Sequence, residues 1–171
     1  MPDRLFRLYQ RRRVINLNAN IIASGLLSTV FVMVILWVMK RFGVDWPTWG
    51  FTAFSVVADL ILDITVFMGL HWVANHWRPL RRGDCPEAKA ALDAKRPSYL
   101  RDTGRLQFER AVISPVYYII AAGLTETLQR QGMSPVWAVG IAYPIGLAAT
   151  RCLHTMWGLR SGTYVDHDRP D

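Results

Sequence analysis

The sequence is poor in cysteine and lacks the compact motifs that identify many soluble enzymes and zinc proteins. Its two cysteines, Cys85 and Cys152, provide no disulfide framework and no C-x-x-C pair for a metal or a redox reaction. It has no H-E-x-x-H sequence, no glycine-rich phosphate loop and no convincing Ser/His/Asp or Cys/His nucleophile. Nucleic-acid-binding motifs are also missing. We therefore assign no catalytic residue, favour a non-enzymatic role and expect no nucleic-acid partner.

Charge is missing from long stretches of a chain that is basic overall. Lys and Arg number 20 against 13 Asp and Glu, which gives a formal net charge of +7, yet residues 21–39 carry no charge. A bilayer-spanning helix needs about 20 apolar residues. The first apolar stretch follows a basic segment, as in a signal peptide, but it is too long and lacks a small-residue cleavage site. We predict an all-α polytopic membrane protein with four transmembrane helices.

The chain is expected to form a single membrane domain of four spans with three segments outside the bilayer. The spans are residues 14–39, 51–74, 111–128 and 135–157. The other segments are a basic cytoplasmic arm, an amphipathic connector and a mobile tail, residues 1–13, 78–110 and 158–171. Gly43 and Pro47 mark a short turn, so spans one and two are predicted to form an antiparallel hairpin.

Basic residues gather in the arm and in the connector, which a four-span topology places on one side of the membrane. The positive-inside rule then puts both termini in the cytoplasm, and we expect a bacterial inner membrane. Tryptophans at both ends of the spans fit two interfacial belts. We expect the basic loops to contact anionic lipid headgroups. Because four spans enclose little space, we also expect a homo-oligomer or a partner membrane protein.

The two hairpins share a local pattern that predicts a parallel internal repeat. Residues 41–43 and 47–49 (RFG, PTW) match residues 130–132 and 135–137 (RQG, PVW), with a one-residue gap. Two helices in each unit keep both units in the same orientation. Chance similarity of two helical hairpins is the alternative explanation, since the match is short. Under this alignment Asp63 and Arg151 follow the preceding proline at the same distance, so we expect them at the same depth as partners.

Each predicted span has a polar face. Side chains spaced about four residues apart share one face of a helix. The faces comprise Asn16, Asn20, Ser24 and Ser28; Thr52, Ser55, Asp59 and Asp63; Ser114, Tyr118 and Thr125; and Thr150, Arg151 and His154. If these polar faces pack toward the inside of the bundle, the apolar sides of the helices face the lipid.

The candidate substrate or ion site consists of Asp59, Asp63 and Arg151, with Asn20 and His154 lining it. Two acids against one arginine suggest a bound proton or cation at one carboxylate, because an acid at bilayer depth is costly. A purely structural Asp63–Arg151 pair is the alternative. A metal site of Asp59, Asp63 and His154 is a weaker one, because carboxylate and imidazole suit iron, manganese or zinc. No cofactor is predicted.

The pattern of spans resembles the GtrA-like membrane proteins. Residues 107–158, and less clearly 14–79, show two apolar spans around a glycine-containing turn. Asn75-His76-Trp77 and the stretch His154–Trp157 are loose counterparts of the family's Asn-Arg-x-Trp-x-Phe ending. The resemblance implies translocation of polyprenyl-phosphate-linked sugars, or help to a partner glycosyltransferase.

Three functions remain open on the sequence. The first is a small transport or flippase-type protein with a buried acid/Arg site for a polyprenyl-linked or other polar substrate. The second is a non-catalytic structural or assembly subunit of a larger membrane complex. The third is a metal-dependent membrane enzyme.

Overall fold

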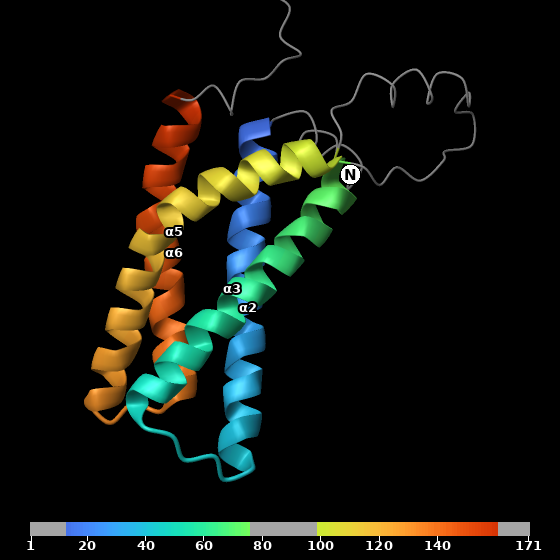
Figure 1. Ribbon diagram of the computed structural model, residues 1–171. Coiled ribbons are helices and arrows are strands. Elements are labelled where there is room, and N and C mark those ends of the chain that lie inside the picture. The colour runs from blue at the N-terminus through green and yellow to red at the C-terminus, as the bar shows by residue number, and fades with distance from the viewer. Residues whose placement is uncertain (1–12, 76–98, 161–171) are drawn as a thin grey trace, which may run out of the picture.

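The computed structural model describes residues 13–75 and 99–160, and every regular element within them is a helix (Figure 1). The helices are α2 (Arg13–Arg41), α3 (Thr48–Asn75), α5 (Tyr99–Arg130) and α6 (Pro135–Arg160). All four are long and apolar enough to cross a membrane. The predicted four-helix membrane architecture is therefore confirmed. Residues 1–12 of the expected arm, 78–98 of the connector and 161–171 of the tail lie outside the described residues.

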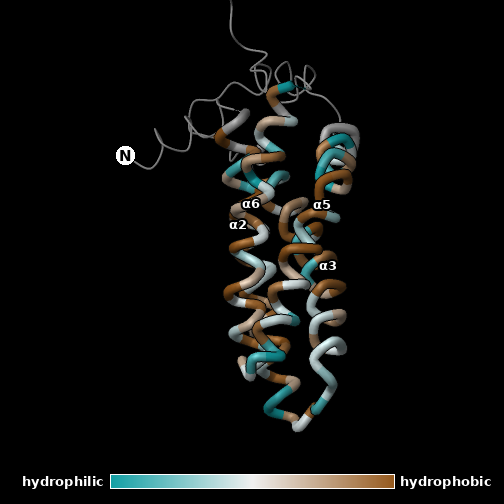
Figure 2. The backbone as a smooth tube through the Cα atoms, turned by 90° about the vertical axis from the view of Figure 1, so that its left-hand side faces the viewer, coloured by the Kyte–Doolittle hydropathy of each residue, from teal (hydrophilic) through white to brown (hydrophobic). Residues whose placement is uncertain are grey.

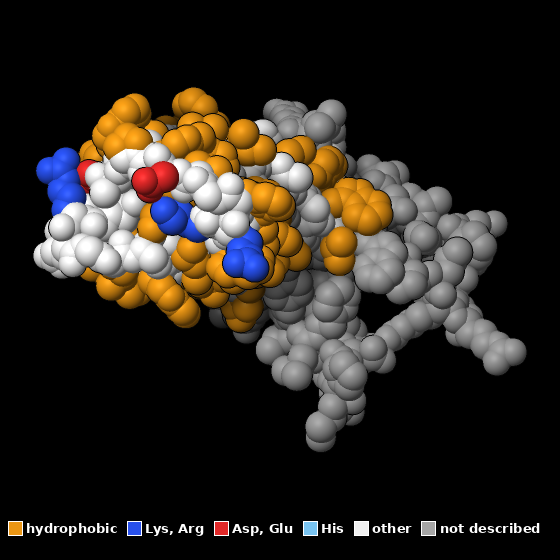
Figure 3. Space-filling model, turned by 90° about the horizontal axis from the view of Figure 1, so that it is seen from below, with side chains coloured by type: hydrophobic (Ala, Val, Ile, Leu, Met, Phe, Trp, Pro, Cys, Tyr) orange, Lys and Arg blue, Asp and Glu red, His pale blue; other side chains and the backbone are white. Residues whose placement is uncertain are grey.

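The helices form two hairpins, α2–α3 and α5–α6, that point the same way (Figure 1). We call the end that holds Arg13, Asn75, Tyr99 and Arg160 the terminal end, and the end that holds residues 42–47 and 131–134 the turn end. Hydrophilic residues are more frequent toward the two ends of the bundle, and the residues of its middle are mainly hydrophobic (Figure 2). At the turn end a few charged side chains are surrounded by hydrophobic ones (Figure 3). This distribution fits a bundle that crosses a bilayer.

The two turns use the same hydrogen-bond pattern. Gly43 and Gly132 each follow a helix end in the left-handed region, with φ of +77° and +90°. In the first turn the N–H of Val44 donates to Met39 O at 3.0 Å, and the N–H of Gly43 donates to Lys40 O at 3.1 Å. In the second turn the N–H of Met133 donates to Leu128 O at 3.0 Å, and the N–H of Gly132 donates to Gln129 O at 2.9 Å. This pair of bonds is the Schellman motif, which satisfies carbonyls at a helix end. The turns align as the sequence repeat predicts.

The helices pack in a ring in which each hairpin contacts the other along two edges. The packed pairs are α2–α3, α3–α5, α5–α6 and α6–α2, whereas α3 and α6 touch little. The larger apolar cluster is drawn from all four helices and includes Leu36, Phe51, Ala121 and Tyr143. A smaller cluster joins α2, α3 and α5 through Leu17, Phe67 and Leu106. A two-fold axis along the membrane normal would map this ring onto itself, so the topology is compatible with a parallel repeat.

Helix α5 is longer than the predicted third span and bends part-way along its length (Figure 1). Pro115 lies inside it and has no N–H to donate to the carbonyl of Ala111. The hydroxyl of Ser114 donates to that carbonyl instead, at 3.0 Å. Proline is the usual cause of a sharp bend in a helix. The bend lets residues 99–110, assigned to the connector from sequence, continue the helix and contact the bundle.

The first turns of α5 are held against the end of α3 by aromatic contacts. The Tyr99 hydroxyl donates to the carbonyl of Met68 at 2.8 Å. Its ring stacks on His71 at 6.2 Å between centroids, and His71 stacks on Phe67 at 5.6 Å. These contacts set the position of the α5 residues that follow, among them Arg110.

Replacing Gly132 with alanine is expected to lower stability by about 1 kcal/mol or more, because a Cβ is strained at φ +90°. Gly123→Ala is the matched control on α5, since a Cβ there meets nothing within 4 Å and alanine favours a helix. Thermal unfolding in detergent should show Gly132→Ala melting below the parent chain and Gly123→Ala at or above it. Equal melting of the two variants would contradict the assignment of the turn.

Candidate functional site

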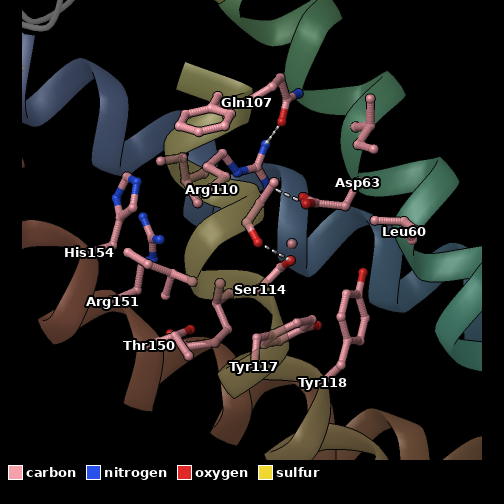
Figure 4. Close-up of a pocket in the computed structure, with 17 residues that line it drawn as sticks. Leu60, Asp63, Gln107, Arg110, Ser114, Tyr117, Tyr118, Thr150, Arg151 and His154 are labelled. Atoms are coloured by element: carbon pink, nitrogen blue, oxygen red, sulfur yellow. Dashed lines mark hydrogen bonds and ion pairs between the residues drawn. The ribbon is translucent and has the colours of Figure 1, made fainter. Parts of the chain in front are cut away.

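A cavity of about 400 Å³ lies in the terminal half of the bundle and is lined by all four helices (Figure 4). Helix α3 contributes Asp63, and α5 contributes Arg110 and two tyrosines. Helix α6 contributes Arg151 and His154 on another part of the wall. The structure thus brings three of the predicted site residues to one cavity: Asp63, Arg151 and His154.

The carboxylate of Asp63 is held between α2 and α5. Ser24 donates its hydroxyl to Oδ1 at 2.7 Å, and the Arg110 guanidinium forms an ion pair and hydrogen bond with Oδ2. Arg110 also donates to Gln107 Oε1 at 3.3 Å and lies 4.4 Å from the Phe67 ring centroid, a cation–π distance. The side chains of Asp63 and Arg110 are 18% and 12% exposed, so the pair lies mostly inside the bundle.

The prediction that Asp63 forms an ion pair with Arg151 is therefore wrong. The ion pair that the structure forms at Asp63 is with Arg110 of α5. Arg151 lies beside His154 on α6, on the other side of Arg110 (Figure 4). Equal depth along two helices does not determine which side chains face each other, because each residue turns the helix by about 100°.

Asp59 is buried beside the cavity but is not part of its wall. Ser28 donates to its Oδ1 at 2.6 Å, and the hydroxyls of Tyr117 and Tyr118 donate to its Oδ2 at 3.2 and 3.3 Å. Both tyrosines line the cavity, so they stand between its interior and the carboxylate. Asp59 is accordingly satisfied by hydroxyl groups from two neighbouring helices.

Asn20 is buried on α2, one turn from Ser24, and does not line the cavity. His154 is fully buried, and its neighbour Thr150 completes the polar strip on α6. Among residues 13–75 and 99–160, no three His, Cys, Asp or Glu side chains come together in a way that could hold a metal ion. The predicted trio of Asp59, Asp63 and His154 does not assemble there.

One side of the cavity is apolar and exposed. Leu60 and Ile64 of α3, and Phe108 of α5, line it and are 42%, 37% and 71% exposed. In a membrane-spanning bundle, exposed apolar side chains face lipid. The cavity therefore has a polar interior and an apolar mouth between α3 and α5 that faces the hydrocarbon.

The charge of the cavity wall differs from the sequence expectation of two acids against one arginine. Asp59 lies behind the tyrosines, and Arg110 joins Arg151 in the wall, so the lining holds two arginines and one aspartate. With histidine counted as neutral, the wall has a net charge of +1. A group of negative charge suits this interior better than the cation predicted from sequence.

Sequence reasoning missed Arg110, Gln107 and Tyr117. Because span three was predicted to begin at residue 111, Arg110 fell at the end of the predicted connector. A signal was present: Arg110, Ser114 and Tyr118 are spaced four apart, so the polar face of α5 extends one turn further back than predicted.

The comparisons with known proteins do not add a relative. No protein-family model, curated protein or solved structure is significantly similar to the chain. The resemblance to GtrA-like proteins stays an expectation from the pattern of spans. The functional argument accordingly depends on the geometry of the cavity.

The Asp63–Arg110 contact can be measured by a double-mutant cycle. Arg110→Gln leaves the partly buried carboxylate of Asp63 without its cation. It is expected to lower the free energy of unfolding by about 2–3 kcal/mol, which is less than for a fully buried pair. Asp63→Asn combined with Arg110→Gln should cost less than the sum of the single changes by about 1 kcal/mol or more. Unfolding in mixed micelles gives the free energies.

Arg151→Gln is the matched comparison for this cycle. Because the ion pair of Asp63 is with Arg110, Asp63→Asn and Arg151→Gln should be close to additive. A coupling between residues 63 and 151 that equals or exceeds the coupling between 63 and 110 would refute the assignment.

Proposed function

We propose that this integral membrane protein is a small transport or flippase-type protein that moves an amphiphile with an anionic head. The observation that supports this proposal is the cavity itself, with charged side chains at its interior and an apolar mouth toward lipid. A lipid-linked substrate would place its head in the interior and leave its chain in the bilayer. A polyprenyl-phosphate-linked sugar belongs to this class.

The two arginines recognise the anionic head. Guanidinium groups bind phosphate and carboxylate oxygens through paired, charge-assisted hydrogen bonds. Arg110 and Arg151 come from different helices, so their guanidinium groups line two parts of the interior (Figure 4). Asp63 orients Arg110 through the ion pair and offsets part of the positive charge, so the head is held without being trapped.

The mouth lets the chain of the amphiphile remain in hydrocarbon. Leu60, Ile64 and Phe108 are exposed there, and burying a charged head in the cavity does not require burying the tail. Because the mouth lies between α3 and α5, separation of these helices admits the head sideways from the bilayer.

We place the terminal end in the cytoplasm of a bacterial cell, with the inner membrane as the site of action. The support is the concentration of Lys and Arg in the arm and connector, which adjoin that end in the sequence. We also propose a homo-oligomer or a partner membrane protein, and contacts between the basic loops and anionic headgroups.

Asp63→Asn is expected to abolish transport while the protein still inserts and folds, because Arg110 loses the carboxylate that positions it. The measurement uses the full chain in vesicles that contain fluorescent NBD-labelled phosphatidic acid. Translocation is followed by dithionite quenching of the outer leaflet. The parent chain should accelerate quenching of the inner-leaflet label, and the variant should not.

Asp45→Asn is the control, since Asp45 is exposed at the turn end and pairs only with the exposed Lys40 among the described residues. It should translocate the probe at the parent rate. NBD-labelled phosphatidylcholine, whose head has no net charge, should move more slowly than phosphatidic acid. Translocation by Asp63→Asn at the parent rate, or equal rates for labelled phosphatidic acid and phosphatidylcholine, would refute the proposal.

A subunit of a larger membrane complex is the second candidate. It is favoured by the hydrogen bonds that Asp59 and Asp63 accept at both carboxylate oxygens, because a structural role requires buried carboxylates to be satisfied. This role predicts stable copurification with one stoichiometric partner and normal assembly of Asp59→Asn. Purification in mild detergent followed by mass spectrometry tests it, and a chain isolated alone or as a homo-oligomer would reject it.

A further inference from the structure

Polar side chains continue from the cavity through the apolar half of the bundle to the turn end. On α3 they lie at positions 48, 52, 55, 59 and 63, which share one helix face. The facing side of α5 carries polar residues at 118, 125, 126 and 129. We call the residues between the cavity and the turn end the polar column: Thr48, Thr52, Ser55, Asp59, Tyr117, Tyr118, Thr125, Glu126, Gln129 and Tyr143.

The outer part of the polar column is a connected network. Glu126 accepts hydrogen bonds from Thr48 at 2.7 Å and from Thr52 at 3.0 Å. Gln129 donates to Thr52 at 2.9 Å, and Arg130 donates to Glu126 at 2.8 Å. The Arg130 side chain is 74% exposed, so this network reaches the surface at the turn end.

The inner part of the polar column centres on Asp59. Its Oδ2 accepts from Tyr117 and Tyr118, both of which line the cavity. A single tyrosine hydroxyl, from either Tyr117 or Tyr118, therefore separates Asp59 from the cavity interior, although Asp59 is itself only 1% exposed. Thr52 and Asp59 are separated by about 10 Å along α3 at 1.5 Å per residue.

The interval between these two parts contains buried polar atoms that lack hydrogen-bond partners. Within the described part of the chain, these include Thr125 Oγ1 and the Tyr143 hydroxyl, and Gln129 Oε1 of the outer network likewise lacks a partner. Thr125 and Tyr143 are fully buried, and the Tyr143 ring lies 5.9 Å, between centroids, from the ring of Tyr117, which donates to Asp59. Ser55, also fully buried, lies on α3 within the same interval.

Buried polar groups without protein partners are normally satisfied by internal water, which needs two to four polar contacts. Ser55 donates its hydroxyl to the carbonyl of Phe51 at 2.7 Å and can still accept a hydrogen bond. Water between Thr125, Tyr143 and Ser55 would join the outer network to Asp59. It would complete a series of hydroxyl, carboxyl and water groups from Glu126 to the cavity, within an otherwise apolar core.

We infer that the polar column conducts protons between the turn end and the cavity, with Asp59 as the group that binds the proton midway. A proton entering near Glu126 passes along the hydroxyl groups and converts the Asp59 carboxylate to a carboxylic acid. It then leaves through Tyr117 or Tyr118 into the cavity, which restores the carboxylate. The net result is one proton moved, with no other reactant consumed.

The groups that face Asp59 fit this role. Helix α2 supplies the Ser28 hydroxyl, and α5 supplies the hydroxyls of Tyr117 and Tyr118, all bonded to Asp59. Asp63 lies one turn further along α3, and Tyr143 of α6 packs against Tyr117. Asp63 is itself paired with Arg110, so the cation nearest the two acids is already engaged. Asp59 can therefore gain and lose a proton without breaking an ion pair.

The test uses the full chain in vesicles that contain the pH dye pyranine, with no amphiphile probe added. A potassium gradient and valinomycin make the interior negative and drive protons inward. The parent chain should acidify the interior faster than protein-free vesicles, and Asp59→Asn should not. Thr125→Val and Tyr143→Phe should each slow uptake by about tenfold, as expected for loss of one hydrogen-bonded step.

Thr127→Val is the matched control, because Thr127 is exposed on the same helix and its hydroxyl donates to the carbonyl of Gly123 one turn back. It should take up protons at the parent rate. Thr125→Val and Tyr143→Phe remove hydroxyls that have no protein partner among the described residues, so neither should lower the melting temperature by much. Parent vesicles no faster than protein-free ones, or parent rates in Asp59→Asn, Thr125→Val or Tyr143→Phe, would overturn the inference. This assay does not measure lipid translocation, so its outcome is independent of the test of the proposed function.

Discussion

Two hydrogen bonds between α2 and α3 set the arrangement on which the remaining polar structure depends. Ser24 donates to Asp63, and Ser28 donates to Asp59, one turn further toward the turn end. Because both pairs are four residues apart on antiparallel helices, a shift of either helix by one turn removes at least one bond. An unsatisfied carboxylate in apolar surroundings is costly, so this register is strongly preferred. It places Asp63 opposite Arg110 and Asp59 beside the tyrosines.

The fold was largely predictable from sequence, and the site only in part. Apolar length and the two glycine turns predicted four helices and their pairing, since these properties depend on local sequence. Residue spacing also identified the serine and acid faces that meet in the structure. The partner of Asp63 was not predictable from depth, because rotation of each helix depends on packing of the whole bundle. Contacts of Tyr99 with α3, and the ion pair of Arg110 with Asp63, hold the polar start of α5 against the bundle, and sequence spacing predicts neither.

Close packing of α6 explains why the cavity lies on the side of α3. A Cβ on Gly25 of α2 would come within 3.0 Å of Leu147, and one on Gly146 would come within 3.2 Å of Tyr117. Small residues at these points let α6 approach both α2 and α5 closely. Helix α3 packs closely on α2 but less closely on α5, and it contacts α6 little, so space remains where α3, α5 and α6 face one another. The polar interior and its lipid-facing mouth follow from this unequal packing.

The bend in α5 also has a consequence for the surrounding bilayer. From Pro115 to Arg130 the helix measures about 24 Å at 1.5 Å per residue, whereas the hydrocarbon core is roughly 30 Å thick. The part of α5 beyond the bend is therefore shorter than the hydrocarbon core, and the bent turns before Pro115 complete the crossing at an angle. A bilayer can also adjust to such a short straight part by local thinning. Thinning beside α5 would bring the headgroup layer closer to the mouth between α3 and α5. The proline that breaks the helix would thereby shorten the distance that a charged head travels through hydrocarbon.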